Sequence, residues 1–380
     1  MPSRIEIEWR RGGITCHDAL HCNNASSAQL QVVLSRYLES LGSASLDGLA
    51  WAANRQVEVA LSDIISPRYG NLSVQAGRWY PARLLPAQAS VGAVFRVVEV
   101  GAQSIVVDLN HPLADAEVHT SIVDLSALSC APSRREAVLE EKLARWLGAG
   151  PGLQHAPNSG PVPVFTSAAA CERDDDSNDA LFYAPPRLVQ HIDSYARATI
   201  ATLYSEHLAH GAKVLDLMSS WVTHLPVTRD DLRIAGLGMN VAELKANPML
   251  VEHTVHDLNQ TPTLPYADAT FDAVICSLSV EYLSKAIAVF RSIAALLKPG
   301  GVFVNTFSDR CFPTKAVRLW GQLHTFERMG FVADMYRQAG QFEAVHTWSE
   351  TGAPRPADDE YATQMSDADP VFAVWATRTK

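Results

Sequence analysis

The feature that most constrains the fold is a series of five short apolar runs in the second half of the chain. They cover residues 213–217, 233–237, 252–257, 271–276 and 301–305, and helical or turn-like stretches separate them. Apolar runs of this length are typical of parallel strands that are buried on both faces. Because strands that alternate with helices form doubly wound sheets, we predict a Rossmann-like α/β domain with a mostly parallel sheet and helices on both faces.

Polar residues and a tight turn stand at the ends of the first three predicted strands. Asp216 ends the first strand, the Gly/Asn turn 236–240 ends the second, and Asp257 ends the third. Ligands of doubly wound sheets bind at the carboxyl ends of strands, near the point where the strand order reverses. We therefore expect these positions to face one ligand site.

Two further stretches carry a family resemblance. LPYADATFDAVICSLSVEYL covers residues 264–283, and LLKPGG follows at 296–301. At this spacing they resemble the class I S-adenosylmethionine-dependent methyltransferases, in particular the type 11 group, over roughly residues 182–310. The resemblance implies S-adenosyl-L-methionine as the cofactor and methyl transfer as the reaction. It also implies that a C-terminal strand at 370–376 inserts antiparallel at the sheet edge.

The resemblance assigns cofactor-binding roles to residues after the first two strands. Asp216 would hold the ammonium group of the cofactor, directly or through water. The backbone N–H groups of Met218, Ser219 and Ser220 would face its carboxylate, as donors at a helix start do. Asn240 would reach the ribose hydroxyls.

Four residues after the third and fourth strands complete this set. Asp257 would accept a hydrogen bond from the adenine amino group, with Leu258 beside the ring. Ser277 and Leu278 would border the reacting methyl group. Because the sulfonium is cationic, aromatic faces nearby would also favour it.

Two positions depart from the family pattern. The family has a glycine-rich first turn, whereas Asp216 is followed here by Leu-Met-Ser-Ser-Trp. The second strand of the family ends in an acid, whereas the matching residue here is Asn240, whose amide can still donate and accept hydrogen bonds. Glycines let a backbone approach a ligand closely, so the alternative is a methyltransferase-like domain that has lost its cofactor.

Methyl transfer is an in-line displacement that needs alignment, and a general base only removes the proton of the acceptor. Candidates for that base are His191, His224 and Tyr183, each of which also fits a purely structural role. The helical pattern at 186–210 places residues 187 and 191 on one helix face. The candidates for binding the methyl acceptor are Arg187, Trp221 and Cys311.

Charge and composition narrow the chemical class of the methyl acceptor. The formal net charge is −10, which disfavours nucleic acid because binding it needs clustered Lys and Arg. We predict a small-molecule acceptor, with a small thiol or sulfide as one option because a thiolate needs little activation near neutral pH. The six cysteines form no CxxC pair, so we expect no metal site and a reducing cytoplasm. No membrane segment or signal peptide is expected.

The first third of the chain has a different pattern. Alternating runs at 4–9, 56–61, 94–100 and 104–108 predict half-buried antiparallel strands, and residues 29–41 predict one helix.

The stretch VVDLNHPLADAEV at 106–118 resembles FKBP-type peptidyl-prolyl isomerases of the bacterial SlyD kind, over about residues 3–128. That resemblance implies a curled antiparallel sheet around one helix and an apolar pocket that twists prolyl bonds. Tyr69 would be the pocket tyrosine and Leu46 its floor. The module would act as an isomerase, or serve in binding or dimerisation.

The predicted organisation is therefore an FKBP-like domain at 1–128, a helix and linker at 129–180, and a methyltransferase domain at 181–380. The linker helix, 133–147, would start at Ser133, and the acidic triplet 174–176 is interpreted as solvated. Two alternatives stay open. One is a prolyl isomerase or chaperone with a cofactor-sensing or degenerate second domain. The other is a scaffold without chemistry, and a homodimer is compatible with each.

Overall fold

The fold was obtained as a computed structural model. It describes residues 3–23, 25–40, 55–64, 74–88, 94–113, 116–125, 139–149, 153–154, 163, 165 and 168–380. By contacts the chain divides into two units, described separately here. Unit 1 is Met1–Phe165 with Leu323–Gly330, and unit 2 is Thr166–Gln322 with Phe331–Lys380.

Unit 2 contains the five strands that the apolar runs predicted and two more. The strands of unit 2 are β8 (Lys213–Leu217), β9 (Arg233–Gly238), β10 (Leu250–Val255), β11 (Phe271–Ser277), β12 (Leu297–Phe307), β13 (Phe342–Thr351) and β14 (Val371–Arg378). Their order is β10-β9-β8-β11-β12-β14-β13. The first five pair in parallel, and β14 is antiparallel to both of its neighbours. The last strand therefore inserts between β12 and β13, and not at the sheet edge as predicted.

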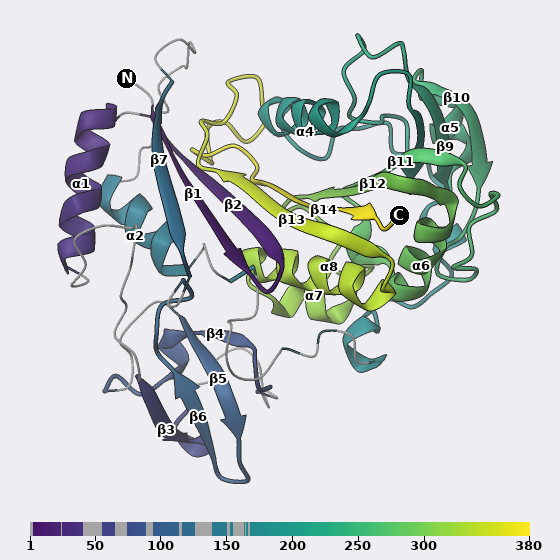
Figure 1. Ribbon diagram of the computed structural model, residues 1–380. Coiled ribbons are helices and arrows are strands. Elements are labelled where there is room, and N and C mark those ends of the chain that lie inside the picture. The colour runs from purple at the N-terminus through teal and green to yellow at the C-terminus, as the bar shows by residue number, and fades with distance from the viewer. Residues whose placement is uncertain are drawn as a thin grey trace. The chain divides into compact units, whose positions relative to one another are not determined.

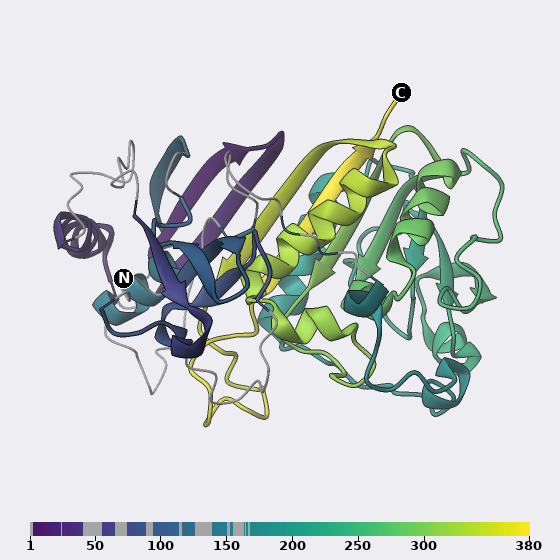
Figure 2. The same ribbon diagram turned by 90° about the horizontal axis from the view of Figure 1, so that it is seen from below.

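Helices cover both faces of this sheet. The helices of unit 2 are α3 (Asp179–Phe182), α4 (Ser194–His207), α5 (Val241–Ala246), α6 (Ala286–Leu296) and α7 (Arg318–Gln322), with short 3₁₀ turns η3 (Ala168–Cys171) and η4 (Val280–Tyr282). Helix α8 (Thr325–Ala339) starts in unit 1 and belongs to unit 2 from Phe331 onward. Figure 1 shows α4 on one face and α6 on the other. Figure 2, from below, shows α6 and the end of α8 in front of the strands. The predicted Rossmann-like fold is confirmed, and its sheet is mixed because β14 runs antiparallel to its neighbours.

One predicted helix begins later than its pattern suggested. Helix α4 starts at Ser194 because the Asp193 side chain caps it, accepting a hydrogen bond from the Ala196 N–H at 2.8 Å. Residues 186–192 before it are not helical. The prediction that Arg187 and His191 share one helix face is therefore wrong. Pro185 and Pro186 disfavour helical geometry at the residues before them, 184 and 185, and the Arg187 backbone N–H donates to Glu243 rather than to a helical carbonyl.

Unit 1 contains antiparallel strands in two separate sheets. Its elements are β1 (Ser3–Arg11), β2 (Ile14–Cys22), β3 (Gln56–Ala60), β4 (Trp79–Pro81), β5 (Val94–Val100), β6 (Ser104–Asp108) and β7 (Val118–Asp124), with α1 (Ser27–Ser40), α2 (Leu139–Ala149), η1 (Leu61–Asp63) and η2 (Ala82–Leu84). Strand β1 pairs with both β2 and β7. The other four strands form a sheet of order β3-β6-β5-β4.

The predicted single curled sheet is thus replaced, in the described residues of unit 1, by two ladders. The hairpin of β5 and β6 extends only to β3 and β4. Leu46, Tyr69 and Ser133, which carried the pocket and helix-start predictions, lie outside the described residues. The domain ranges 1–128, 129–180 and 181–380 remain a prediction.

The acidic triplet 174–176 is not simply solvated. Asp174 lies 3.4 Å from the Arg318 guanidinium, Asp175 lies 3.2 Å from Lys315 Nζ, and Asp176 lies 3.1 Å from the Arg173 guanidinium. These acids are therefore part of a mixed-charge cluster, which a run of like charges in the sequence does not reveal.

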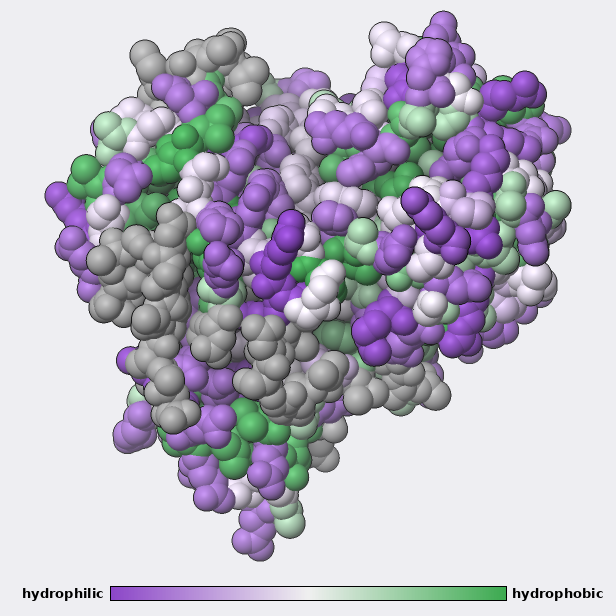
Figure 3. Space-filling view, in the orientation of Figure 1, coloured by the Kyte–Doolittle hydropathy of each residue, from purple (hydrophilic) through white to green (hydrophobic). Residues whose placement is uncertain are grey.

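No helix in the described residues is long and apolar enough to cross a membrane. In the view of Figure 3, hydrophilic residues cover much of the surface of unit 2.

The hydroxyl of Tyr336 anchors the end of α8 to the sheet of unit 2. It donates to the Phe303 carbonyl at 2.9 Å and accepts from Asn305 Nδ2 at 2.7 Å, and all three residues are buried. We predict that Tyr336→Phe lowers the free energy of unfolding by about 1–3 kcal/mol, because buried polar groups lose their partner. Urea denaturation measures this loss. Tyr361→Phe is the control, since no described residue hydrogen-bonds the Tyr361 hydroxyl, and an equal loss in both variants would contradict the prediction.

Candidate active site

The carboxyl ends of β8 and β9 meet through their backbones. Met218, directly after β8, has a φ of 56°, a left-handed conformation that favours glycine. The next N–H, of Ser219, donates to the Leu237 carbonyl at 2.8 Å. A Cβ on Gly238 would lie only 2.2 Å from the Ser219 carbonyl oxygen. The turn therefore keeps the path of a glycine turn without a glycine, while the glycine that close packing requires stands in β9.

This bond changes one predicted role. Since the Ser219 N–H is committed to Leu237, it does not face a ligand carboxylate. The N–H groups of Met218 and Ser220 retain that predicted role, and all three residues line the cavity described below.

Asp216 is a buried carboxyl at the centre of the site. It is 2% exposed, and its Oδ2 accepts from the Ser219 hydroxyl at 2.6 Å. Burial raises the pKa of this carboxyl to about 7, because the low-dielectric interior disfavours the charged form. No basic side chain of the described residues contacts it. A buried acid of this kind is suited to a cationic ligand.

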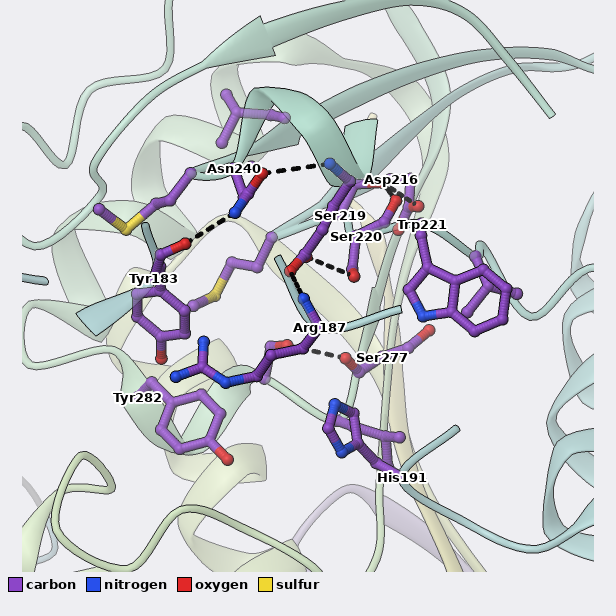
Figure 4. Close-up of a pocket in the computed structure, with 18 of the residues that line it drawn as sticks. Tyr183, Arg187, His191, Asp216, Ser219, Ser220, Trp221, Asn240, Ser277 and Tyr282 are labelled. Carbon is purple, nitrogen blue, oxygen red and sulfur yellow. Dashed lines mark hydrogen bonds between the residues drawn. The ribbon is translucent and has the colours of Figure 1, made fainter. Parts of the chain in front are cut away.

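A segment that we call the strap, residues 183–191, lies against the N-terminal end of α5. The Asn240 side chain accepts from the N–H groups of Ala242 and Glu243 and donates to the carbonyls of Tyr183 and Ala184. Figure 4 shows Asn240 joined to Tyr183 in this way. All four hydrogen-bonding capacities of the amide are thereby used. In this arrangement Asn240 caps a helix and holds the strap, so its ribose contact stays a prediction that requires the strap to move.

Glu243 is a site residue that the sequence analysis missed. Its carboxylate accepts from the Arg187 N–H at 2.6 Å and from the Ser220 hydroxyl at 2.7 Å, and it lines the same cavity. Its position three residues after the capping Asn240 was the available signal, since a first-turn acid commonly faces a helix start. Glu243 supplies the carboxylate that the end of the second strand lacks.

Arg187 lies among aromatic rings. Its guanidinium carbon is 4.5 Å from the Phe182 ring centroid and 5.4 Å from that of Phe312, and one nitrogen donates to the Phe182 carbonyl. The indole N–H of Trp221 donates to the Val189 carbonyl at 3.2 Å. Both residues therefore form walls of the cavity that the strap covers.

Asp257 caps the turn after β10. Its carboxylate accepts from the N–H groups of Asn259 and Gln260 and from the Gln260 side chain. Each carboxylate oxygen accepts about two hydrogen bonds, so Oδ2 retains acceptor capacity. Leu258 beside it is buried.

At the end of β11, the Ser277 hydroxyl bonds to the Tyr204 hydroxyl at 2.7 Å, and Tyr204 bonds to Thr306 at 2.9 Å. Leu278 follows with a φ of 51°, so the main chain turns sharply where the strand reaches the cavity.

The three candidate bases differ in their ability to take a proton. Burial raises the pKa of the Tyr183 phenol far above its usual range. Burial, with Arg197 and His191 adding to it, lowers the pKa of His224 to about 4. Burial and the charge of Arg187 lower the pKa of His191, although Glu243 opposes this. Both imidazoles are therefore neutral at pH 7 and able to accept a proton.

Two neighbouring cavities organise these residues. The first, of about 150 Å³, is lined by all nine predicted cofactor residues and by Tyr183, Arg187, His191, Trp221 and His224. The second, of about 700 Å³, is lined by Cys311 and again by His191. The structure thus brings every predicted site residue except Cys311 to one cavity. His191 is the only candidate base that lines both.

A buried ion cluster supports the walls. Lys315, fully buried, lies 3.1 Å from Asp179, and the Arg173 guanidinium donates to both oxygens of Asp179. Asp179 lines the first cavity.

Comparisons with known proteins agree with this architecture. Residues 231–305 match a family model described as a methyltransferase domain. The ubiquinone/menaquinone biosynthesis C-methyltransferase of Haemophilus ducreyi is 29% identical over 150 residues, which is 38% of this chain and 49% of that protein. The chain therefore spans about half the length of this curated relative.

Solved structures give weaker matches. A methyltransferase from Aquifex aeolicus is 14% identical with a TM-score of 0.33, over 53% of this chain and 97% of that one. One from Mesorhizobium loti is 16% identical with a TM-score of 0.30, over 47% and 96%. The [4+2]-cyclase SpnF is 18% identical with a TM-score of 0.36, over 53% and 91%. Scores of this size carry no argument about activity.

The raised pKa of Asp216 predicts a pH-dependent stability cost. The pKa of Asp216 in the folded state, about 7, lies above its value in the unfolded state, so the folded state binds more protons. The contribution of this group to the free energy of unfolding therefore falls as pH rises from about 4 to about 7. We predict that Asp216→Asn stabilises the ligand-free protein by roughly 1–3 kcal/mol at pH 8 and by much less at pH 5. Urea unfolding of wild type and variant at both pH values checks this, and an equal difference at the two would refute it.

The role of Asn240 predicts local opening of the strap. Asn240→Ala removes two helix-cap bonds and two strap bonds, so hydrogen exchange in peptides covering 183–191 should quicken about tenfold. Mass-resolved exchange of the full chain measures this. Asn247→Ala is the matched control at the other end of α5, because its amide donates to Ser220 and not to the strap. Unchanged exchange in the Asn240 variant would show that the strap is held otherwise.

Proposed function

We propose that this chain, whose residues 231–305 belong to a class I S-adenosylmethionine-dependent methyltransferase domain, is a methyltransferase acting on a small-molecule acceptor. One observation carries the proposal. A fully buried carboxyl, Asp216, stands without a basic partner in the described residues, where the ends of β8, β9 and β11 line one cavity. A buried charge needs a partner, and a cationic ligand supplies one.

S-adenosylmethionine is the cofactor of this domain family, and the residues present fit it. When bound, it supplies an electrophilic methyl group on a cationic sulfur. Ionised Asp216 would pair with its ammonium group, and the free acceptor capacity of Asp257 suits the adenine amino group. Glu243, joined by Asn240 once the strap has moved, would reach the ribose hydroxyls. The N–H groups of Met218 and Ser220 are left to face its carboxylate.

The cavity of about 150 Å³ is smaller than the 300–1,000 Å³ typical of ligand sites. The strap lies against it, held by Asn240, Glu243 and Trp221. We infer that the strap moves outward to admit the cofactor. These three residues hold it by four hydrogen bonds, and a hydrogen bond contributes only about 1 kcal/mol net, or about 1.5–3 kcal/mol where one partner is charged.

His191 is the proposed general base. It lines both cavities, so it stands between the place of the methyl group and the place of the acceptor. Ser277 and Leu278 border the methyl group from the end of β11. Trp221 and Arg187 shape the wall on the strap side, and Cys311 belongs to the acceptor side. A thiol or sulfide remains one acceptor to test.

For unit 1 we propose an FKBP-like accessory role, with prolyl isomerase activity as a second candidate function. The proposal rests on the VVDLNHPLADAEV stretch at 106–118 alone, because the described strands of unit 1 form two ladders and not the single curled sheet of that family. A proline-limited refolding assay with the full chain tests it, and a rate equal to the uncatalysed one would leave only the accessory role.

Calorimetric titration of the full chain tests cofactor binding. We predict that S-adenosylmethionine binds, and that Asp216→Ala and Asp257→Ala each weaken binding by roughly 1–3 kcal/mol, because a charged hydrogen bond is lost. At pH 6 binding should also release protons, since the cation favours the ionised form of Asp216. The control is Asp268→Ala, an exposed acid on the turn before β11. Unaltered affinity in both site variants would mean that the pocket is misplaced.

A further inference from the structure

The second cavity offers a place for the acceptor. Its volume is about 700 Å³, within the range of small-molecule sites. It shares six lining residues with the cofactor cavity, which are Val189, Gln190, His191, Leu278, Tyr282 and Phe312. Since these side chains line both spaces, a molecule in the second cavity lies next to one in the first.

The inner wall of the second cavity is a rigid arrangement of paired charges. The N–H of Asp193 donates to the Asp369 carboxylate at 3.0 Å, and the N–H of Asp369 donates to the Asp193 carboxylate at 2.6 Å. Arg355, 1% exposed at its side chain, contacts both acids and also Asp359. Arg355 therefore offsets only part of the charge of these three acids, and its contacts fix the segment that follows it in place.

The rim carries charge that is not offset in this way. Six carboxyl groups and two guanidinium groups line the cavity. Of the two guanidinium groups, that of Arg310 pairs with Asp369 and lies 4.9 Å from the Tyr361 ring centroid. Asp358 and Glu360 are exposed lining residues, and no described cation pairs with either. The mouth is thus negative, and the Tyr361 ring also lines this cavity.

We propose that the second cavity is the acceptor site and that it selects an acceptor bearing a positively charged ammonium group. Asp358 and Glu360 hold that charge at the mouth, while the atom to be methylated faces His191 and Leu278. The inference rests on the proposed methyl transfer and names its substrate class. Like charges repel, so the same rim disfavours carboxylate-bearing acceptors.

The transfer step balances without another reactant. The lone pair of the acceptor atom forms the bond to the methyl carbon, and the electron pair of the breaking carbon–sulfur bond stays on sulfur. The acceptor atom then gives its proton to the His191 imidazole. The ammonium group at the mouth takes no part and serves only to orient the molecule.

The test compares three probes of equal shape and different charge. These are choline, its neutral carbon isostere 3,3-dimethylbutan-1-ol, and the anion 3,3-dimethylbutanoate. Each is titrated by ligand-observed NMR into the full chain in the presence of S-adenosylhomocysteine. We expect choline to bind about fivefold more tightly than the neutral probe at low salt, with the anion weakest, and the preference to shrink at high salt.

Matched variants locate the effect. Asp358→Asn/Glu360→Gln should abolish the preference for choline, because it removes the two rim charges and no described ion pair. Asp230→Asn/Asp268→Asn removes two exposed acids from the turns before β9 and β11, at the opposite ends of those strands, and should preserve it. Equal binding of choline and the neutral probe, or an unchanged preference in the rim variant, overturns the proposal.

This outcome is separate from the fate of the proposed function. If S-adenosylmethionine does not bind, the proposed methyltransferase function is wrong, regardless of how the probes bind. If the cofactor binds and the probes show no charge preference, only the acceptor class fails. Methylation rates of cysteamine, 2-mercaptoethanol and mercaptoacetate test the same charge preference on thiol acceptors. We expect the cationic cysteamine to react fastest and the anionic mercaptoacetate slowest.

Discussion

The walls of both cavities depend on one buried ion cluster. Lys315 has no exposed surface and lies against Asp179 and Asp175, while Arg173 binds Asp179 with two hydrogen bonds. Removing one member of such a cluster leaves an uncompensated buried charge, which costs several kcal/mol, so the cluster forms as a unit. It joins the segment leading into the strap to the segment after β12 that carries Phe312. The positions of both walls are therefore fixed together.

Much of the second unit was predictable because burial leaves a mark on composition. A strand covered on both faces is a continuous apolar run, as β8, β9, β11 and most of β12 are, whereas the edge strand β10 is largely exposed. The clustering of Asp216 and Asp257 followed from topology alone, since parallel strands end at one edge. The pKa of such a carboxyl was not predictable, because it depends on the groups around it in the fold. Asp216 has a raised pKa because it is buried and no basic side chain of the described residues contacts it.

The sequence predictions failed where contacts with residues far along the chain decide the local structure. Residues 186–192 have helical spacing of apolar side chains, yet their backbone bonds to Glu243 and their carbonyl groups to other elements. Asn240 matches the ribose-binding position of the family in sequence, and in this arrangement its amide is engaged by the strap. Both outcomes depend on contacts between residues more than 50 apart in the chain, which no window of sequence contains. In unit 1 the sequence predicted β1, β3, β5 and β6, but it predicted neither β2, β4 and β7 nor the division into two sheets.

The turn after β8 keeps the backbone course of a glycine-rich turn although it contains no glycine. Met218 has a backbone angle normally reserved for glycine, and Gly238 in the neighbouring strand makes room for the carbonyl of the next residue, Ser219. A ligand that hydrogen-bonds to amide groups senses only the course of the main chain. Searches that demand glycine in the first motif therefore overlook proteins of this kind, and screening by dihedral angles at the first strand's end would recover them.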